Sequence, residues 1–375
     1  MVIGKVNDAP NQIGFQRIAA LADQGNLHVV TTAPLPETLK AVVSGEHPVP
    51  GTLSMWKKSL ELVRRFSNES DVVVHTVWGP RPLVAGYICK LRARAYWVYD
   101  LYDHPSLTWR RAGPLAKFLK RAVWGLLSRL VRKADVWVIG MHPGILSHMP
   151  TPNPACELVL TGPGTSLGAD RVGSGSRTGE TEIGICYAGP VNTERGIGII
   201  AGWARQYEGP PACLHLMGRS DSESSRLIDE AAEEAKLRGL RIVRYGWVPH
   251  SRVVETMHAC DIGLCLLDPD VLNYRFAYPV KIVEYMAHGL IPVASAGHGV
   301  KSLVRHGENG FISSYTIDGF ARTMKSALAV AMDSDARRKY IENGTKDIDR
   351  HNWQTVNKQL IADLDVAYSF SGRCE

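Results

Sequence analysis

The sequence predicts an α/β protein built from two parallel-sheet domains that face a central cleft. The chain has 375 residues, which is more than one ordinary hydrophobic core organises and which suits two domains of typical size. Short runs rich in Val and Ile alternate with longer helical patterns along most of the chain. One Gly- and Ser-rich stretch interrupts that alternation near the middle.

The short apolar runs predict the strands. They are apolar on both faces and helical patterns separate them, which is typical of parallel sheets covered on both sides. In the first half the runs lie at 27–32, 71–77, 95–102, 135–140 and 157–162. In the second half they lie at 183–189, 213–218, 241–248, 262–267 and 291–295.

The Gly- and Ser-rich stretch, residues 168–182, predicts an interdomain linker. The predicted domains are therefore 1–167 and 183–350. A last helical pattern within 351–375 is expected to pack back on the first domain. Ligands of open parallel sheets bind at the carboxyl ends of the strands, so two such sheets face to face would create a cleft.

Composition predicts a soluble protein of a reducing compartment. Apolar residues make up 45% and charged residues 21% of the chain, as in globular proteins. We expect no membrane span, because no sufficiently long apolar run occurs. We expect no signal peptide, because the N-terminus lacks a basic region followed by an apolar region and a cleavage site. The seven cysteines contain no C-x-x-C pair, which favours free thiols and a cytoplasmic protein.

Charge is unevenly distributed. Residues 1–165 hold 19 Lys/Arg and 11 Asp/Glu, a balance of +8, whereas the remainder holds 24 and 26, a balance of −2. The first half therefore suits an anionic partner. We do not expect nucleic acid to be that partner, because the basic residues lie in one helical region without a recognised motif.

Residues 279–295 carry the most informative pattern. Pro279 begins a helix that ends at Gly289, and a buried strand follows. Lys281 lies in the first helical turn, where the positive helix end disfavours a cation unless an anion is shared. Glu284 follows on the same face and could accept hydrogen bonds from sugar hydroxyls. A solvated Lys–Glu pair on a surface helix would have the same spacing.

This segment resembles the donor-site motif of the group 1 glycosyltransferases, family-4-like enzymes of the GT-B fold, which has two Rossmann-like domains. The pattern is P-x-K-x-x-E-Y-M-A-x-G-x-x-P-V-A-S. Further matches follow the family's order along the second half. They are Tyr187–Gly196, Tyr245–Pro249, Ala259–Gly263, Val304–Phe311 and Asn352–Trp353.

The resemblance implies the donor-binding residues. Arg195 and Lys281 would neutralise the donor diphosphate, and Gly189 would let the backbone approach it. Glu284 would bind ribose or sugar hydroxyls, and the main chain near Val248 would contact the base.

Two positions depart from the family. Phe276 stands where retaining members usually carry an acid, eight residues before Glu284. Pro190 replaces a frequent second cation. The first departure leaves the sugar contacts and the stereochemical outcome open.

In the first half, Tyr99–Pro105 resembles the family's D-x-x-D-x-x-P loop, with the proline one place early. A carboxylate there could take a proton from the acceptor hydroxyl. Asp103 is the first catalytic candidate, His104 the second and Asp100 the third; the alternative is that the two aspartates cap a turn. Gly14, at the next helix start after the first strand, suits a phosphate or acceptor contact, although a plain strand–helix turn fits equally.

A basic amphipathic stretch runs from Arg110 to Lys133, with eight Lys/Arg and no acid. Basic side chains interleaved with aromatic and aliphatic ones are typical of a helix attracted to an anionic membrane surface. The expected membrane contacts are Lys117, Lys120, Arg121 and Trp124. The alternative is a core-facing helix with a solvated basic face.

The predicted function is therefore glycosyl transfer from a UDP- or GDP-sugar to a lipid-linked saccharide or glycolipid. The enzyme would act as a peripheral protein on the cytoplasmic face of the cell membrane. No cofactor is expected, and no metal, because D-x-D and H-E-x-x-H patterns do not occur. A sugar-nucleotide epimerase of the same fold and a non-catalytic nucleotide-sugar- or glycan-binding homologue are the alternatives.

Overall fold

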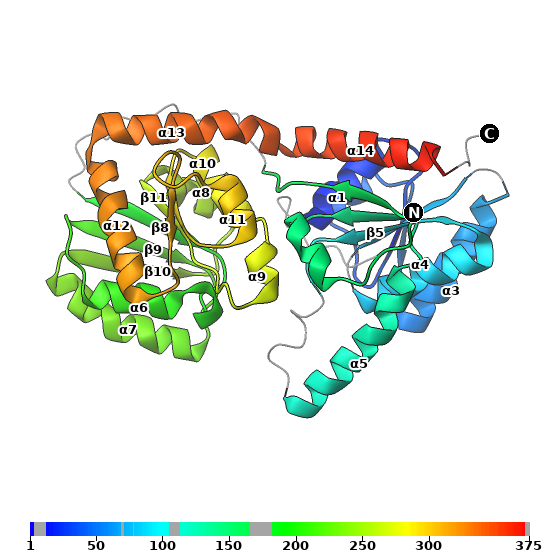
Figure 1. Cartoon of the computed structure of the whole chain (residues 1–375), viewed down its shortest axis with the longest axis horizontal. Coiled ribbons are helices and arrows are strands. Elements are labelled where there is room, and N and C mark those ends of the chain that lie inside the picture. The colour runs from blue at the N-terminus through cyan, green and yellow to red at the C-terminus, as the bar shows by residue number, and fades with distance from the viewer. Residues whose placement is uncertain (4–12, 69–70, 78, 105–112, 166–181, 372–375) are drawn as a thin grey trace. The chain divides into compact units, whose positions relative to one another are not determined.

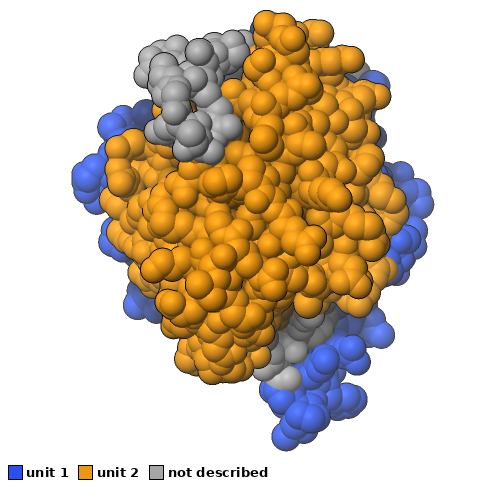
Figure 2. Space-filling model, turned by 90° about the vertical axis from the view of Figure 1, so that its left-hand side faces the viewer, with its two compact units in different colours: residues 1–164, 353–375 blue, residues 165–352 orange. Residues whose placement is uncertain are grey.

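The computed structural model describes residues 1–3, 13–68, 71–77, 79–104, 113–165 and 182–371. The chain forms two compact units (Figure 2), residues 1–164 with 353–375, and residues 165–352. The predicted linker, 168–182, lies almost entirely outside the described residues.

Unit 1 contains a parallel sheet with the strand order β3-β2-β1-β4-β5-β6-β7. The chain starts in the middle of this sheet and winds outward in both directions, as in doubly wound folds. The strands are β1 Val2–Ile3, β2 His28–Thr31, β3 Gly45–Pro48, β4 Val73–Val77, β5 Tyr96–Leu101, β6 Val136–Ile139 and β7 Glu157–Leu160.

Helices cover both faces of this sheet (Figure 1). Side chains of α3 and α4 form one core with Ile3, Val30 and Val74, and on the other face α1 and α14 pack over the sheet. Leu360 and Ala367 of α14 join the core of β5 and β6, so the last helix belongs to unit 1. The helices are α1 Ile13–Ala22, α2 Glu37–Lys40, α3 Thr52–Phe66, α4 Pro80–Ala93, α5 Pro114–Val131, the 3-10 helix η2 Pro143–His148, and α14 Trp353–Ser369.

Unit 2 contains a second parallel sheet, ordered β10-β9-β8-β11-β12-β13. The strands are β8 Ile183–Ala188, β9 Ala212–Met217, β10 Leu240–Gly246, β11 Ile262–Cys265, β12 Ile291–Ser295 and β13 Phe311–Ser313. The winding direction reverses between β8 and β11, and in open sheets the loops at such a switch point form the ligand crevice.

The helices of unit 2 also pack on both faces of their sheet. Helices α6, α7 and α12 bury their apolar side chains on one face, and α10 packs on the other, where a Cβ on Gly263 would meet the Tyr285 ring at 2.3 Å. The elements are η3 Thr193–Arg195, α6 Ile197–Arg205, α7 Ser222–Leu237, α8 His250–His258, α9 Leu272–Phe276, α10 Val280–Ala287, α11 His298–Leu303, α12 Ile317–Met332, α13 Ser334–Ile348 and η4 Asp349–His351.

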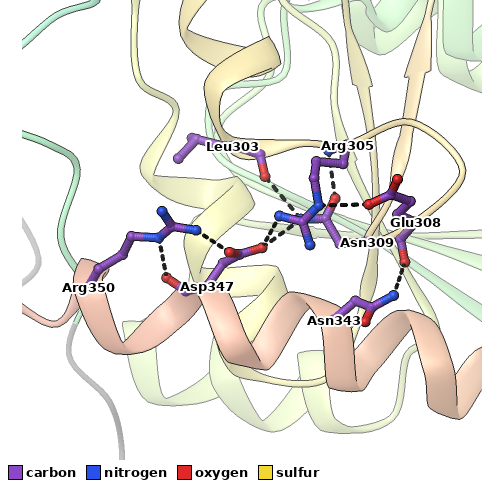
Figure 3. A network of polar contacts seen from close by, with 7 residues as sticks. All are labelled: Leu303, Arg305, Glu308, Asn309, Asn343, Asp347 and Arg350. Atoms are coloured by element: carbon purple, nitrogen blue, oxygen red, sulfur yellow. Dashed lines mark hydrogen bonds and ion pairs between the residues drawn. The ribbon is translucent and has the colours of Figure 1, made fainter.

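A polar network fixes the turn before β13 against α13 (Figure 3). The Asp347 carboxylate accepts hydrogen bonds from the guanidinium groups of Arg305 and Arg350 and from the amide of Asn309. The amide of Asn309 also donates to the Leu303 carbonyl at 3.1 Å. These side chains stabilise the turn, so the family-like segment 304–311 has a structural role here.

Candidate functional site

The candidate site lies at the carboxyl edge of the unit 2 sheet, at the switch point between β8 and β11. Tyr285 holds α10 at this edge, because its hydroxyl accepts a hydrogen bond from the Ala188 backbone N–H at 3.2 Å and donates to the Leu264 carbonyl at 3.1 Å. The start of α10 and the loop after β8 are therefore fixed to each other.

Gly189 follows β8 with a φ of +123°, in a region that favours glycine. A Cβ here would lie 2.6 Å from Nζ of Lys281. Any other residue would be strained and would displace the lysine, so glycine is needed both for the turn and for the close approach of the cation.

Lys281 is partly buried, and its ammonium lies 4.6 Å from the centre of the Tyr187 ring. Burial, assisted by the nearby Arg195 charge, lowers the pKa of Lys281 to about 8. The side chain therefore stays mostly protonated at neutral pH, although its charge is poorly solvated. A bound anion would relieve that desolvation and raise the pKa.

Arg195 ends the short helix η3, where the Asn192 side chain accepts a hydrogen bond from the Arg195 N–H at 3.1 Å. Its guanidinium lies 5.4 Å from the centre of the Tyr274 ring. Within the described part of the chain, no carboxylate forms an ion pair with Arg195 or Lys281. The two cations repel each other and share the carboxyl edge of one sheet, which is the electrostatic setting of an anion site.

The structure thus brings Gly189, Arg195, Lys281 and Glu284 together, and their roles stay predictions. Glu284 lies one helical turn after Lys281, is partly buried, and its charge raises the lysine pKa slightly against the effect of burial. Val248 lies apart from this cluster, in the loop after the edge strand β10. Sequence reasoning missed the aromatic supports Tyr187 and Tyr274, because their contacts join segments distant in the chain.

The three catalytic candidates of unit 1 differ in accessibility. Asp100 is fully buried at the end of β5, where Oδ2 accepts from Nε of Arg17 at 3.0 Å and contacts Nε2 of His75 at 3.1 Å. Burial opposes ionisation, but Arg17 and His75 overcome it and hold the pKa of Asp100 below its usual value. Asp103, in contrast, is partly exposed.

His104 is 5% exposed, and its ring meets Trp124 edge to face at 6.1 Å. Burial lowers the pKa of His104 to about 4, so the imidazole is neutral at pH 7. Gly14 is the second residue of α1 and has open space around its Cβ position. The loop before it, residues 4–12, lies outside the described residues, so the role of Gly14 stays a prediction.

Helix α5 places apolar side chains in solvent. Five large ones are 54–72% exposed: Leu115, Phe118, Leu119, Val123 and Leu126. Of the residues expected at a membrane, Lys120 and Arg121 are exposed, whereas Lys117 and Trp124 are half-buried. The alternative of an ordinary core-facing helix does not fit this exposure.

Neither a metal cluster nor a membrane span is found among the described residues. No three or more of their His, Cys, Asp and Glu side chains are grouped so that they could hold a metal ion. No helix within those ranges is long and apolar enough to cross a membrane.

Each unit holds a doubly wound parallel sheet, and two cations lie at the switch point of the second sheet, an arrangement that fits the GT-B fold. Residues 184–329 match the family described as glycosyl transferases group 1. The resemblance found in the sequence is therefore confirmed by this match to a group 1 glycosyltransferase model, and solved GT-B structures share the fold. No curated protein sequence matches the chain.

Solved structures share the fold over nearly the whole chain. HepE of Anabaena, crystallised with UDP and glucose, has a TM-score of 0.71 and 16% identity over 97% of this chain and 99% of its own. Sucrose-phosphate synthase of Thermosynechococcus elongatus has a TM-score of 0.70 and 18% identity over 98% of each chain. The lipopolysaccharide outer core galactosyltransferase WaaB has a TM-score of 0.65 and 13% identity over 97% of this chain and 98% of its own.

Proposed function

We propose that the protein transfers a sugar from a nucleotide-diphosphate sugar, UDP- or GDP-linked, to a lipid-linked saccharide or glycolipid at a membrane surface. One observation carries the donor assignment. Arg195 and Lys281 lie together at the switch point of the unit 2 sheet, each over an aromatic ring, without a carboxylate in ion-pair contact among the described residues. The complexes of HepE with UDP and with UDP-glucose support the same class of donor.

A diphosphate suits these two cations. Its negative charges would neutralise both side chains at once, and charge-assisted hydrogen bonds to phosphate are among the strongest that proteins form. During transfer the diphosphate leaves with increased charge, so the same cations would stabilise the transition state. The proposal assigns this task to Arg195 and Lys281 instead of a divalent metal.

Asp103 is the proposed general base. It is the partly exposed carboxylate of the loop after β5, whereas Asp100 is fully buried and paired with Arg17. The neutral imidazole of His104 lies next in the chain and would help to orient the acceptor hydroxyl.

Helix α5 supports a membrane-bound acceptor. Residues 113–133 include six Lys/Arg and no acid, and the apolar side chains of α5 stand in solvent beside them. An anionic bilayer complements both features, because acyl chains receive the apolar side chains and lipid phosphates attract the cations. Each cation near such a surface adds about 1 kcal/mol.

Titration of the purified protein with UDP, GDP and dTDP and with their sugars tests the donor assignment. We expect one nucleotide to raise the melting temperature and its sugar form to raise it further, because only the folded state binds. No stabilisation by any nucleotide would refute the proposal. Net release of an isomerised nucleotide-sugar without any transfer would favour the epimerase, and binding without turnover on any acceptor would favour the non-catalytic homologue.

A further inference from the structure

His298 begins α11, and the two glycines that flank it let the start of this helix lie directly against the end of α9. A Cβ on Gly299 would lie 1.9 Å from the Ala277 carbonyl oxygen, and a Cβ on Gly297 would lie 3.2 Å from the Arg275 carbonyl oxygen. A larger residue at 299 would push the start of α11 away from α9. Backbone packing therefore fixes the place of His298.

The side chains of Phe276 and His298 stack face to face. Their ring centres are 4.9 Å apart, and the ring planes differ by 6°. Phe276 is 5% exposed, whereas His298 is exposed. The buried Phe276 ring thus restricts the orientation of the His298 imidazole, which lies at the surface.

The same helix also contacts one cation of the candidate site, Arg195. Tyr274 of α9 supports Arg195, and Phe276 of α9 supports His298. These groups lie in the segments that follow β8, β11 and β12, at the carboxyl ends of strands that are neighbours in the sheet. Ser295 locks the last two segments together, because its Oγ accepts from the Leu267 N–H at 2.7 Å and donates to the Leu267 carbonyl at 2.6 Å.

Phe276 is also the position at which retaining group 1 enzymes usually carry an acid. We propose that His298, stacked on Phe276, contacts the sugar of the nucleotide-sugar donor in place of that acid. The inference rests on the proposed function and deepens it by naming the residue that reads the sugar. An imidazole can donate through one ring nitrogen and accept through the other, whereas a carboxylate only accepts, so His298 can bind a sugar hydroxyl or a sugar carboxylate.

The affinity difference between a free nucleotide diphosphate and its sugar form isolates this contact. We would measure it by calorimetry with UDP, UDP-glucose and UDP-glucuronic acid, and with GDP and GDP-mannose, on the full chain. In His298→Ala the gain in affinity from the best sugar should fall roughly threefold to tenfold, the range of one hydrogen bond. Affinity for the free diphosphate should stay within about twofold, because Arg195 and Lys281 are unchanged.

Three further variants separate a sugar contact from a structural role. His298→Gln keeps a polar group of similar reach and should retain most of the gain, and Phe276→Leu removes the flat platform and should lose part of it. His258→Ala is the matched control, since His258 is exposed in the same unit but ends α8 at the amino edge of the sheet. It should behave as the wild type.

The outcomes are distinct. A wild type that binds no nucleotide diphosphate refutes the proposed function, and this inference with it. If the sugar adds affinity in the wild type and His298→Ala retains that gain, only the role of His298 is refuted. The role of His298 is also refuted if no sugar in the panel adds affinity to the wild type.

Discussion

At the scale of single residues, Lys281 has two properties that a surface lysine lacks. It is packed against Gly189 and the Tyr187 ring, and its pKa is lowered to about 8 by burial and then by Arg195. Both follow from its place in the first turn of α10, next to the loop after β8. The charged form of Lys281 is therefore destabilised by poor solvation and by Arg195, and a bound anion would stabilise it.

Lys281→Ala should weaken binding of UDP or GDP at least tenfold without lowering the melting temperature. The reason is that a hydrogen bond to a charged group contributes about 1.5–3 kcal/mol, and about 1.4 kcal/mol already corresponds to a tenfold change in affinity. Calorimetric titration measures the affinity. Lys236→Ala on the exposed side of α7 is the control, and unchanged affinity in Lys281→Ala would remove the lysine from the donor site.

Donor affinity should also fall as the pH rises above about 8. Above this pH, Lys281 loses its proton in the free protein, whereas it stays protonated when a diphosphate is bound. Donor binding must then be accompanied by the uptake of a proton by Lys281. Titrations with UDP-glucose at pH 7, 8 and 9 measure this slope. The Lys281→Ala variant should show no such slope, and an equal slope in both proteins would contradict the assignment.

Replacement by asparagine should affect activity at Asp103 and stability at Asp100. Asp103→Asn should abolish transfer and leave donor binding intact, because the partly exposed carboxylate loses its basicity while unit 2 is untouched. Asp100→Asn should instead lower the free energy of unfolding by about 3–5 kcal/mol, since Arg17 loses its buried partner. Radiolabelled sugar transfer and urea unfolding measure the two effects, and normal turnover in Asp103→Asn would exclude it as the base.

The pH dependence of stability gives a check on Asp100. Because its folded-state pKa is lowered, its stabilising contribution is present above the usual unfolded value of about 3.9 and is lost as the pH falls through the folded-state pKa. The wild type should lose this contribution on acidification below about pH 4, and Asp100→Asn should not.

At the scale of elements, helix α5 changes the membrane prediction. The sequence indicated the basic residues and Trp124, but Trp124 packs against His104, and the solvent-facing apolar side chains come from Leu115, Leu119 and Leu126 with their neighbours. Amphipathicity alone does not reveal which face a helix buries, because that choice depends on its tertiary neighbours.

A triple variant Leu119→Ser, Val123→Ser and Leu126→Ser should lose most binding to vesicles that contain phosphatidylglycerol. The side chains are already exposed, so the melting temperature should not fall. Cosedimentation measures binding, with phosphatidylcholine vesicles and raised salt as further arms. Leu237→Ser on α7, 90% exposed, is the control. Undiminished binding of the triple variant would exclude α5 as the contact.

The sequence predicts most strands, because long buried runs of Val and Ile are distinctive. It does not reveal β3 and β13, since Gly45–Pro48 lacks an apolar run and Phe311–Ser313 is very short. The donor cluster is recognisable from local motifs in Tyr187–Gly196 and Pro279–Ser295. The stack of His298 on Phe276 is not, because it depends on a contact between segments 22 residues apart that only packing brings together.

At the scale of the whole molecule, unit 2 is inserted in unit 1. Thr165 N–H donates to the His351 carbonyl at 2.8 Å, and Gly164 lies against the Trp353 ring, so the chain leaves and re-enters unit 1 at adjacent points. All the predicted donor-binding residues lie between these points. The predicted catalytic aspartates and α5 lie in unit 1.

The isolated segment 165–352 should therefore fold and bind the donor nucleotide within a few-fold of the full chain. It keeps its own core, and the contacts described above for Gly189, Arg195 and Lys281 are with residues of the segment itself. Circular dichroism and calorimetry test this, with Lys281→Ala in the same segment as control. The complementary truncation after residue 352 should aggregate, because the apolar face of β5 and β6 under α14 becomes exposed.

The position of α14 also sets the order in which the nascent chain can fold. Unit 2 is complete once residue 352 has left the ribosome, whereas unit 1 waits for its final helix although most of it was synthesised first. The usual amino-to-carboxyl order of domain maturation is thus reversed here. A chain whose synthesis stops before α14 would carry a folded unit 2 next to an incomplete unit 1, and chaperones would have to cover the apolar face that α14 normally buries.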